Sequence, residues 1–344
     1  MKIAQVLTAS TGGIGRHVAS VASRLVQRGH AVRIYGPVQS VRAHHLDDLG
    51  AEVLPLARLS RLTGADAVHA HGYKAGAVAL APCRDRRMPL VVTWHNAVLA
   101  TGATAMAGHS LQRLVARGAD LTLGASGDLV RQARGLGSAE VRLSPVAAPV
   151  LGPPEVPRDV QRRKLGLTDD DVMILTVSRL APQKNLGLVL DIARSVRERP
   201  ELMFLIAGDG PLRGTLAERA RTEGSNVRLL GHQDQMASLL AAADLALLTS
   251  TWEARALVAQ EALLAGVPLL TTRIEGIEEL VDDAAAFFDA DDLDEAVRKL
   301  LELAHDRDRR AALQAAGSAR AATWPDEDAV VDDLLSHYRE VARR

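Results

Sequence analysis

Residues 250–268 read STWEARALVAQEALLAGVP, and this stretch holds the end of one strand, a loop, a helix and the start of another strand. Helix-favouring residues run onward from Leu257, and Gly266 followed by Pro268 predicts that the helix ends before the next strand begins. The same alternation of short apolar runs and helical patterns extends along the chain. It is typical of parallel sheets with helices on both faces, so the sequence predicts an α/β protein.

Short runs rich in apolar and β-branched residues predict the strands. Seven of these runs lie before residue 148 and six lie after residue 161. They are residues 3–8, 31–35, 52–56, 67–71, 90–94, 121–125 and 141–144, followed by 172–177, 203–207, 227–230, 245–248, 268–272 and 286–288.

A proline-rich stretch divides the 344 residues into two domains. Residues 148–157 contain four prolines, which indicates a linker. We predict a Rossmann-like domain at 1–148, a linker at 149–160, a second Rossmann-like domain at 161–325 and a tail helix at 326–344 that packs back on the first domain. Two doubly wound domains of this kind are expected to face each other across a ligand cleft at the carboxyl ends of their strands.

Composition excludes several classes of partner and site. The net charge of −1 and the 3% of aromatic residues argue against nucleic-acid binding, which relies on basic surfaces and stacking rings. The single cysteine, Cys83, precludes an intrachain disulfide and a cysteine-based metal site. No run approaches the roughly 18 apolar residues of a membrane span, and the first strand leaves no room for a signal peptide. We therefore expect a cytoplasmic protein.

Two carboxylates stand out within residues 250–268. Glu253 lies on the loop at the end of a strand, and Glu261 lies two turns into the following helix. Backbone N–H groups around Ala256, Leu257 and Val258 would be free at the helix N-terminus, where a phosphate binds well. A carboxylate beside such a site can accept hydrogen bonds from a vicinal diol of a sugar.

A cationic pair follows the first strand of the second domain. Residues 177–185 read VSRLAPQKN and place Arg179 and Lys184 five positions apart on the loop. Arginine can bind a phosphate through two parallel hydrogen bonds, and lysine adds a compact charge. Charge that develops on a leaving diphosphate would be stabilised there without a metal.

Two motifs of the first domain complete the candidate site. Residues 10–18 read STGGIGRHV, and Gly12 and Gly13 permit close approach of the backbone to a phosphate or sugar. A dehydrogenase loop would have a third glycine near Val18 and an acidic residue after the second strand, and the chain has neither. Residues 93–96 read TWHN and place His95 just after a strand.

Together these motifs resemble those of glycosyltransferase family 4, and the resemblance covers nearly the whole chain. It implies the GT-B fold and transfer with retention of anomeric configuration. It also implies that Glu253 holds hydroxyls of the donor sugar and that Glu261 binds the ribose of the nucleotide. Arg179 and Lys184 would then face the diphosphate, and His95 would contact the donor sugar.

The chain departs from this family pattern at several positions. Ala256 stands where a glycine is commoner, and Asn96 replaces an aspartate after His95. Glu275 and Glu278 replace a glycine and a proline, and near a diphosphate they would be repulsive unless Arg273 or Arg255 offsets them.

We therefore predict a metal-independent, retaining glycosyltransferase that uses a nucleotide-diphosphate sugar, with UDP as the expected nucleotide. The first domain would bind a small-molecule or lipid-linked acceptor, chiefly through residues 98–117. We expect no cofactor or metal, because His69 and His71 show no third ligand at useful spacing. We interpret the acidic run 289–292 as a helix cap, and the basic run 84–87 as a solvated loop that could also contact a membrane surface.

Two alternatives stay open at this point. One is a nucleotide-sugar 2-epimerase on the same architecture, which would form product with no acceptor present. The other is a non-catalytic nucleotide-sugar-binding protein, which the substitutions at Ala256 and Glu275 would allow.

Overall fold

The computed structural model describes residues 1–10, 12–98 and 102–344, with the side chain of residue 103 left out. The chain folds into two compact units. Unit 1 comprises Met1–Pro149 together with Pro325–Arg344, and unit 2 comprises Val150–Trp324.

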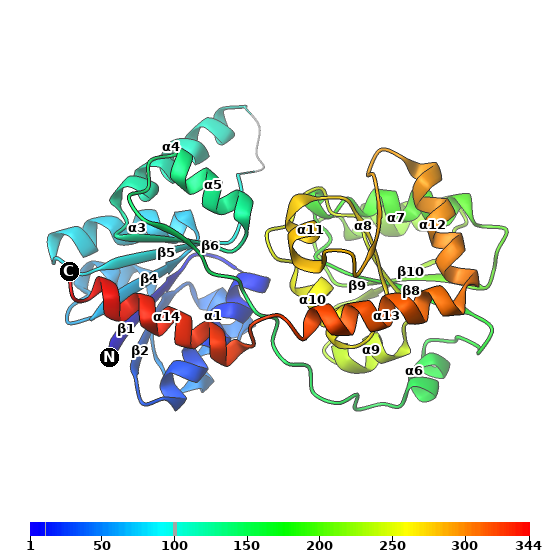
Figure 1. Ribbon diagram of the computed structural model, residues 1–344, viewed down its shortest axis with the longest axis horizontal. Helices are drawn as coiled ribbons and strands as arrows, with labels where there is room; N and C mark the ends of the chain where they lie inside the picture. The colour runs from blue at the N-terminus through cyan, green and yellow to red at the C-terminus, as the bar shows by residue number, and fades with distance from the viewer. Residues whose placement is uncertain (11, 99–101) are drawn as a thin grey trace. The chain divides into compact units, whose positions relative to one another are not determined.

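A parallel sheet of seven strands forms the centre of unit 1 (Figure 1). The strand order is β3-β2-β1-β4-β5-β6-β7, so the order reverses between β1 and β4. The strands are β1 Lys2–Leu7, β2 Ala31–Gly36, β3 Glu52–Pro55, β4 Ala67–His71, β5 Leu90–Trp94, β6 Leu121–Gly124 and β7 Val141–Leu143.

Helices cover both faces of this sheet. One face carries α1 and α14, and the other carries α3, α4 and α5 (Figure 1). Helix α1 faces the sheet because Val18, Val21, Ala22 and Leu25 repeat at helical spacing and are all buried. The helices of unit 1 are α1 Gly13–Gln27, α2 Val38–Ala43, α3 Tyr73–Asp85, α4 Gly102–Gly118, α5 Gly127–Gly135 and α14 Glu327–Val341, with short 3₁₀ helices at Leu46–Leu49 and Leu56–Arg61.

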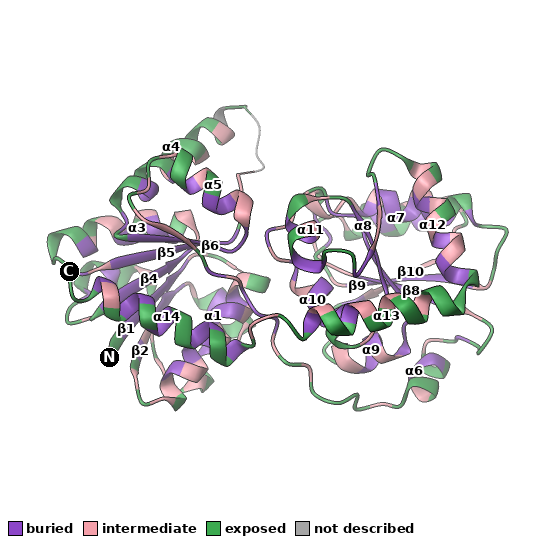
Figure 2. Ribbon diagram, in the orientation of Figure 1, coloured by how far each residue is buried: buried purple, intermediate pink, exposed green. Residues whose placement is uncertain are grey.

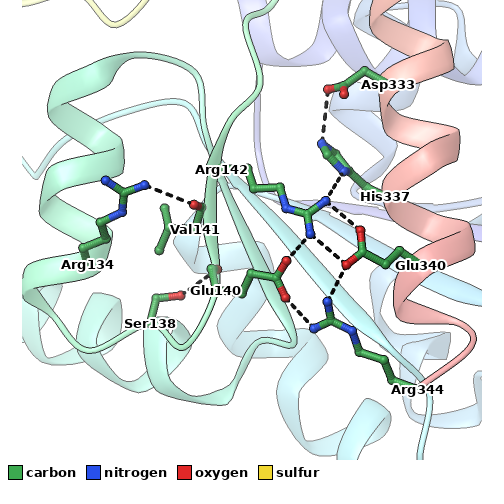
Figure 3. Close-up of polar contacts among 9 residues, drawn as sticks. All are labelled: Arg134, Ser138, Glu140, Val141, Arg142, Asp333, His337, Glu340 and Arg344. Atoms are coloured by element: carbon green, nitrogen blue, oxygen red, sulfur yellow. Dashed lines mark hydrogen bonds and ion pairs between the residues drawn. The ribbon is translucent and has the colours of Figure 1, made fainter.

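Helix α14 is fixed to unit 1 by apolar packing and by charges near both of its ends. Val331, Leu334 and Tyr338 join the core that α1 shares with the sheet. Near the end of the chain, Arg142 of β7 donates to both carboxylate oxygens of Glu340, at 2.7 and 2.8 Å (Figure 3). The tail therefore folds as part of unit 1.

The second sheet has six parallel strands in the order β10-β9-β8-β11-β12-β13. The order reverses here between β8 and β11. The strands are β8 Val172–Val177, β9 Leu202–Ala207, β10 Val227–Gly231, β11 Leu245–Leu248, β12 Leu269–Thr272 and β13 Ala286–Phe288.

Two apolar cores lie on the two faces of this sheet. Helices α7, α8 and α12 cover one core, and α9, α10 and α11 cover the other. In both units the central strands are buried, whereas the edge strands β3, β7 and β10 are partly exposed (Figure 2). The helices of unit 2 are α6 Arg158–Lys164, α7 Leu186–Ser195, α8 Arg213–Thr222, α9 Met236–Ala242, α10 Leu257–Leu264, α11 Glu275–Val281, α12 Leu293–His305 and α13 Arg307–Ala321, with a 3₁₀ helix, η3, at Pro182–Lys184.

The α/β class is confirmed, and each predicted strand lies within one residue of an observed one. The predicted linker at 149–160 needs a correction, because α6 begins at Arg158 and occupies its last three residues. Helix α6 forms there because its arginines pair with Asp244, Arg158 at 2.5 Å and Arg162 at 2.8 Å. These ion pairs fix the segment to unit 2. Within the described ranges, no helix is both long enough and apolar enough to cross a membrane.

Candidate functional site

The predicted site residues follow the strands at which the sheet order reverses. Loops on either side of such a point diverge, and this leaves space for a ligand at the carboxyl ends of the strands. In unit 1 the pair Gly12 and Gly13 follows β1. In unit 2 Lys184 follows β8 and Glu253 follows β11, which are the two strands that flank the reversal.

An ion pair joins the two loops of unit 2. The ammonium group of Lys184 donates to Oε1 of Glu253, and the hydroxyl of Ser250 donates to the same oxygen at 2.7 Å. The side chain of Lys184 is 22% exposed and that of Glu253 is 11% exposed. Both charges are therefore partly shielded from water while they stay accessible to a ligand.

Backbone contacts hold these loops together as one piece. The Thr251 N–H donates to the Gln183 carbonyl at 2.9 Å, and the Thr249 hydroxyl donates to the Lys184 carbonyl at 2.9 Å. The Gln183 side chain donates to the Trp252 carbonyl at 2.6 Å. Hydrogen bonds therefore fix the two loops that carry the ion pair relative to each other.

Arg179 lies on the same loop as Lys184 and is exposed. It makes no ion pair with any residue in the described ranges. The glycines after β9 support its loop at close range, because a Cβ on Gly208 would lie 1.9 Å from the Ser178 carbonyl oxygen and one on Gly210 would lie 2.5 Å from that of Leu180. The turn at 207–212 is thus a support for the Arg179 loop.

Helix α10 begins at Leu257, as the sequence predicts. Ala256 is its N-cap residue and makes no side-chain capping bond, so the first-turn N–H groups, including those of Leu257 and Val258, lack a capping side chain. The methyl group of Ala256 packs in the core of unit 2. Glu261 is only 1% exposed, and its predicted role as the ribose ligand stays a prediction.

A glycine allows α11 to approach the Glu253 loop. A Cβ on Gly276 would lie 1.9 Å from the Glu253 carbonyl oxygen and 2.6 Å from that of Ala254. No side chain fits in that space, so Gly276 sets the position of the loop that presents Glu253.

An arginine pairs with Glu278, one of the unusual carboxylates near this loop. Arg273 donates to Glu278 at 3.0 Å and also lies 3.5 Å from Asp289. Arg255 lies over the ring of Trp324, at 5.9 Å from its centroid. Arg273 thus offsets the charge of Glu278, as the sequence analysis required.

In unit 1 the glycine loop opens helix α1. Gly12 is the N-cap residue and Gly13 the first helical residue, and both are exposed. Apart from its chain neighbours, no described atom lies within 4 Å of a Cβ placed on Gly12, so the space beside this residue is not filled by described protein atoms. Gly15 is packed instead against the imidazole of His44.

His95 belongs to a cluster of buried histidines at the carboxyl ends of β4 and β5. Its Nε2 lies 3.3 Å from Nδ1 of His71, and the ring of His17 lies 5.3 Å from that of His95. Burial lowers the pKa of His17 to about 4 and holds the pKa values of His71 and His95 well below their usual value. All three imidazoles are therefore neutral near pH 7.

A second histidine of β4 connects this cluster to the tail helix. His69 Nδ1 lies 2.6 Å from the Tyr338 hydroxyl, and His69 Nε2 lies 2.6 Å from the Thr93 hydroxyl. His69 also packs against His71, with ring centroids 4.1 Å apart and ring planes tilted by 38°. Helix α14 thereby helps to hold the imidazoles beside His95.

The sequence analysis did not connect His17 and His71 with His95. His17 lies four positions after Gly13 on α1, whereas His71 ends β4, and only the fold brings these distant segments together. The available signal was the period-two spacing of His69 and His71, which places both on one face of a strand.

Three further predictions can be compared with the structure. Asp292 caps α12 by accepting from the Glu295 N–H at 2.8 Å, which confirms the capping interpretation. Arg84, Arg86 and Arg87 are exposed, and their membrane contact stays a prediction. In the predicted acceptor segment 98–117, residues 99–101 lie outside the described residues and α4 begins at residue 102.

Comparisons with known proteins identify the family of the chain. The family model for glycosyl transferases group 1 matches residues 157–320, and the model for the glycosyl transferase 4-like domain matches residues 12–149. A GDP-mannose-dependent phosphatidylinositol monomannoside mannosyltransferase of Corynebacterium glutamicum is 34% identical over 186 residues, about half of each chain (50% of this one and 49% of that one). A D-inositol 3-phosphate glycosyltransferase of Geodermatophilus obscurus is 28% identical over 96% of this chain and 85% of its own.

The fold matches solved structures over its full length. A crystal structure of HepE from Anabaena in complex with UDP-glucose has a TM-score of 0.82 at 20% identity and covers 98% of this chain and 100% of that one. Together the two family models cover every strand of the two sheets except β1, which lies before residue 12. The predicted GT-B fold and enzyme class are therefore confirmed, and the chain belongs to the glycosyltransferases of family 4.

Proposed function

We propose that this chain transfers a sugar from a nucleotide-diphosphate sugar to a hydroxyl acceptor, with retention of anomeric configuration and without a metal. The similarity to proteins named as GDP-mannose-dependent or solved with UDP-glucose supports a nucleotide-sugar donor. UDP is the nucleotide that we expect. We also place the reaction in the cytoplasm, where nucleotide sugars are made.

The ion pair between Lys184 and Glu253 is the observation that carries this proposal. A diphosphate beside Lys184 and Arg179 would compete with Glu253 for the ammonium group, because phosphate oxygens are strong acceptors for both cations. Glu253 would then be released to accept hydrogen bonds from hydroxyls of the donor sugar. In the free protein, Lys184 thus keeps the partly buried carboxylate paired until a donor arrives.

The transfer step needs no protein nucleophile. The bond between the anomeric carbon and the diphosphate oxygen breaks, and the acceptor oxygen bonds to that carbon on the same face. The acceptor proton passes to the leaving diphosphate. Arg179, Lys184 and the N–H groups at the start of α10 would stabilise the charge that develops on the diphosphate.

The remaining predicted residues would bind and orient the substrates. His95 is a neutral imidazole, so it can exchange hydrogen bonds with a sugar hydroxyl without adding charge. Gly12 and Gly13 would allow close approach of the donor, and Glu261 would bind the ribose. Relatives named for an inositol phosphate and for a phosphatidylinositol mannoside support a small-molecule or lipid-linked acceptor for unit 1.

The test compares turnover and donor affinity in one variant. Release of nucleoside diphosphate is measured with UDP-glucose and GDP-mannose for the wild type, Glu253→Gln and the control Glu295→Gln, whose carboxylate pairs with Lys299 away from the site. We expect Glu253→Gln to lower turnover by about 100-fold or more and to spare nucleotide affinity. Equal loss of turnover and affinity would refute the assigned role.

The same assay separates the two alternatives. An epimerised sugar formed with no acceptor would establish the 2-epimerase. Tight donor binding with no release of nucleoside diphosphate, even by slow hydrolysis, would establish a non-catalytic binding protein.

A further inference from the structure

Three imidazoles from separate segments meet in unit 1. His17 comes from α1, His71 is the last residue of β4, and His95 directly follows β5. One ring nitrogen from each lies within 4.8 Å of the others, and the three residues are 6%, 2% and 8% exposed. Within the described residues, no other group of three histidine, cysteine or carboxylate side chains comes together in this way.

The spacing of these nitrogens suits a tetrahedral metal ion. Zinc binds an imidazole nitrogen at about 2.0–2.1 Å, which places two nitrogens on one ion about 3.4 Å apart. His71 Nδ1 and His95 Nε2 are already 3.3 Å apart. His17 comes from helix α1, and one of its ring nitrogens lies within 4.8 Å of a ring nitrogen of each of the other two histidines.

A buried nitrogen of this cluster has no partner. His71 Nε2 makes no hydrogen bond with any described residue, although it is inaccessible to water. The bond between His71 and His95 uses one proton, so Nε2 is left either as a lone pair with no donor or as an N–H with no acceptor. Buried polar atoms rarely stay unpaired, so the described residues alone do not satisfy the His71 ring.

We propose that His17, His71 and His95 form a binding site for one transition-metal ion of the zinc class. Three imidazoles and a water molecule are a known ligand set for zinc. Imidazole ligands favour Zn²⁺, Co²⁺, Ni²⁺ and Cu²⁺, whereas Mg²⁺ and Ca²⁺ prefer oxygen. The sequence analysis set a metal aside because His69 and His71 lacked a further ligand nearby, and the fold supplies His17 and His95.

The surrounding residues hold the site in shape. His69 packs against His71 with the two ring planes tilted by 38°, and His69 is itself held by Tyr338 and Thr93. Outer contacts of this kind orient metal ligands.

The proposed transfer reaction needs no metal, so this site goes beyond that function. His95 is also the residue expected to contact the donor sugar. A metal bound at His95 would remove it from the sugar, and zinc-class ions should therefore inhibit transfer.

The test measures metal binding directly on the full chain. The protein is prepared without a histidine tag, stripped with a chelator and titrated with Zn²⁺ by calorimetry and with Co²⁺ by visible absorption. We expect one ion per chain and the absorption of tetrahedral cobalt. His17→Gln should weaken binding by at least about tenfold. The control His45→Gln, whose side chain is 81% exposed, should bind like the wild type, and Mg²⁺ should not bind.

A thermal-shift measurement separates loss of metal binding from loss of folding in the variants. A metal that binds the native state raises the melting temperature of the wild type, and His17→Gln should lose most of that shift while its metal-free melting temperature reports on folding. The proposal is overturned if folded wild type binds no zinc, if His17→Gln binds as tightly as His45→Gln, or if Mg²⁺ binds equally well. Since no sugar donor is needed, these outcomes leave the transferase proposal untouched.

Discussion

Tyr338 and His69 are 269 residues apart in the sequence, and the Tyr338 hydroxyl lies 2.6 Å from His69 Nδ1 in the middle of unit 1. Both residues are fully buried. His69 in turn bonds Thr93 through its other nitrogen. Two hydrogen bonds through His69 thus connect α14 to the neighbouring strands β4 and β5.

Removal of that hydroxyl should loosen the tail. In Tyr338→Phe the buried His69 Nδ1 would lose its partner, which costs about 1–3 kcal/mol in the free energy of unfolding. Denaturant titration measures the change. Tyr35→Phe is the control because the Tyr35 ring is also buried. It should lower the free energy of unfolding by less than Tyr338→Phe does. Equal stability of Tyr338→Phe and wild type would show that the bond contributes nothing.

The position of the Glu253 loop should depend on Gly276. Gly276→Ala would place a methyl group 1.9 Å from a backbone carbonyl oxygen, so the loop must move or the helix must shift, at a cost of about 1–3 kcal/mol. Nucleotide affinity should fall together with the melting temperature. Gly214→Ala is the matched control, since α8 has open space there and helix propensity favours alanine. Similar behaviour of the two variants would contradict the close approach.

Acid should weaken the attachment of the tail helix. Hydrogen bonds from Arg142 and then Arg344 lower the pKa of Glu340 to about 2 (Figure 3). A carboxylate whose pKa is lowered in the folded state adds to the free energy of unfolding at pH values above its ordinary pKa, near 4.5. That contribution is lost as the pH falls towards 2.

Stability measured by denaturant between pH 5 and about pH 2.5 checks this dependence. In Arg142→Gln the free energy of unfolding should depend less on pH, because Glu340 would lose its principal partner. Arg134→Gln should not show this change, since among the described residues Arg134 donates to the Val141 carbonyl and makes no bond with Glu340. An equally steep pH dependence in Arg142→Gln and wild type would exclude the network as its source.

Cys83 should be unreactive in the native protein. Burial, followed by the nearby Asp120, raises the pKa of its thiol to about 12, so almost no thiolate exists near neutral pH. Alkylation followed by mass spectrometry should find Cys83 unmodified in buffer and modified in denaturant. Rapid modification of folded protein would place the thiol at the surface.

Local patterns in the sequence were sufficient to predict the strands and to select about half of the residues of the candidate site. Apolar runs bounded by glycine and proline define each strand within a residue, and parallel strands bring the ends of β8 and β11 to one edge. The sequence therefore placed Lys184 and Glu253 on loops after their strands, and the neighbouring positions of β8 and β11 come from the fold. Helix α6 was missed because its stability comes from Asp244, a partner some 80 residues away.

The rest of the site depends on contacts that no local pattern records. The meeting of His17, His71 and His95 requires three segments to converge, and their spacing in the chain is irregular. The role of Gly276 was equally hidden, because the sequence does not show that this second residue of α11 packs against the Glu253 carbonyl.

Calorimetric titration of UDP, with GDP in parallel, tests the central claim that the Lys184–Glu253 pair marks the donor site. It compares wild type, Lys184→Gln and Lys299→Gln, since Lys299 forms a similarly exposed ion pair with Glu295 on α12. We predict that one nucleotide binds wild type and Lys299→Gln equally and binds Lys184→Gln about tenfold or more weakly, because a charged hydrogen bond to phosphate is lost. Equal binding to both variants, or no binding to wild type at millimolar nucleotide, would contradict the account.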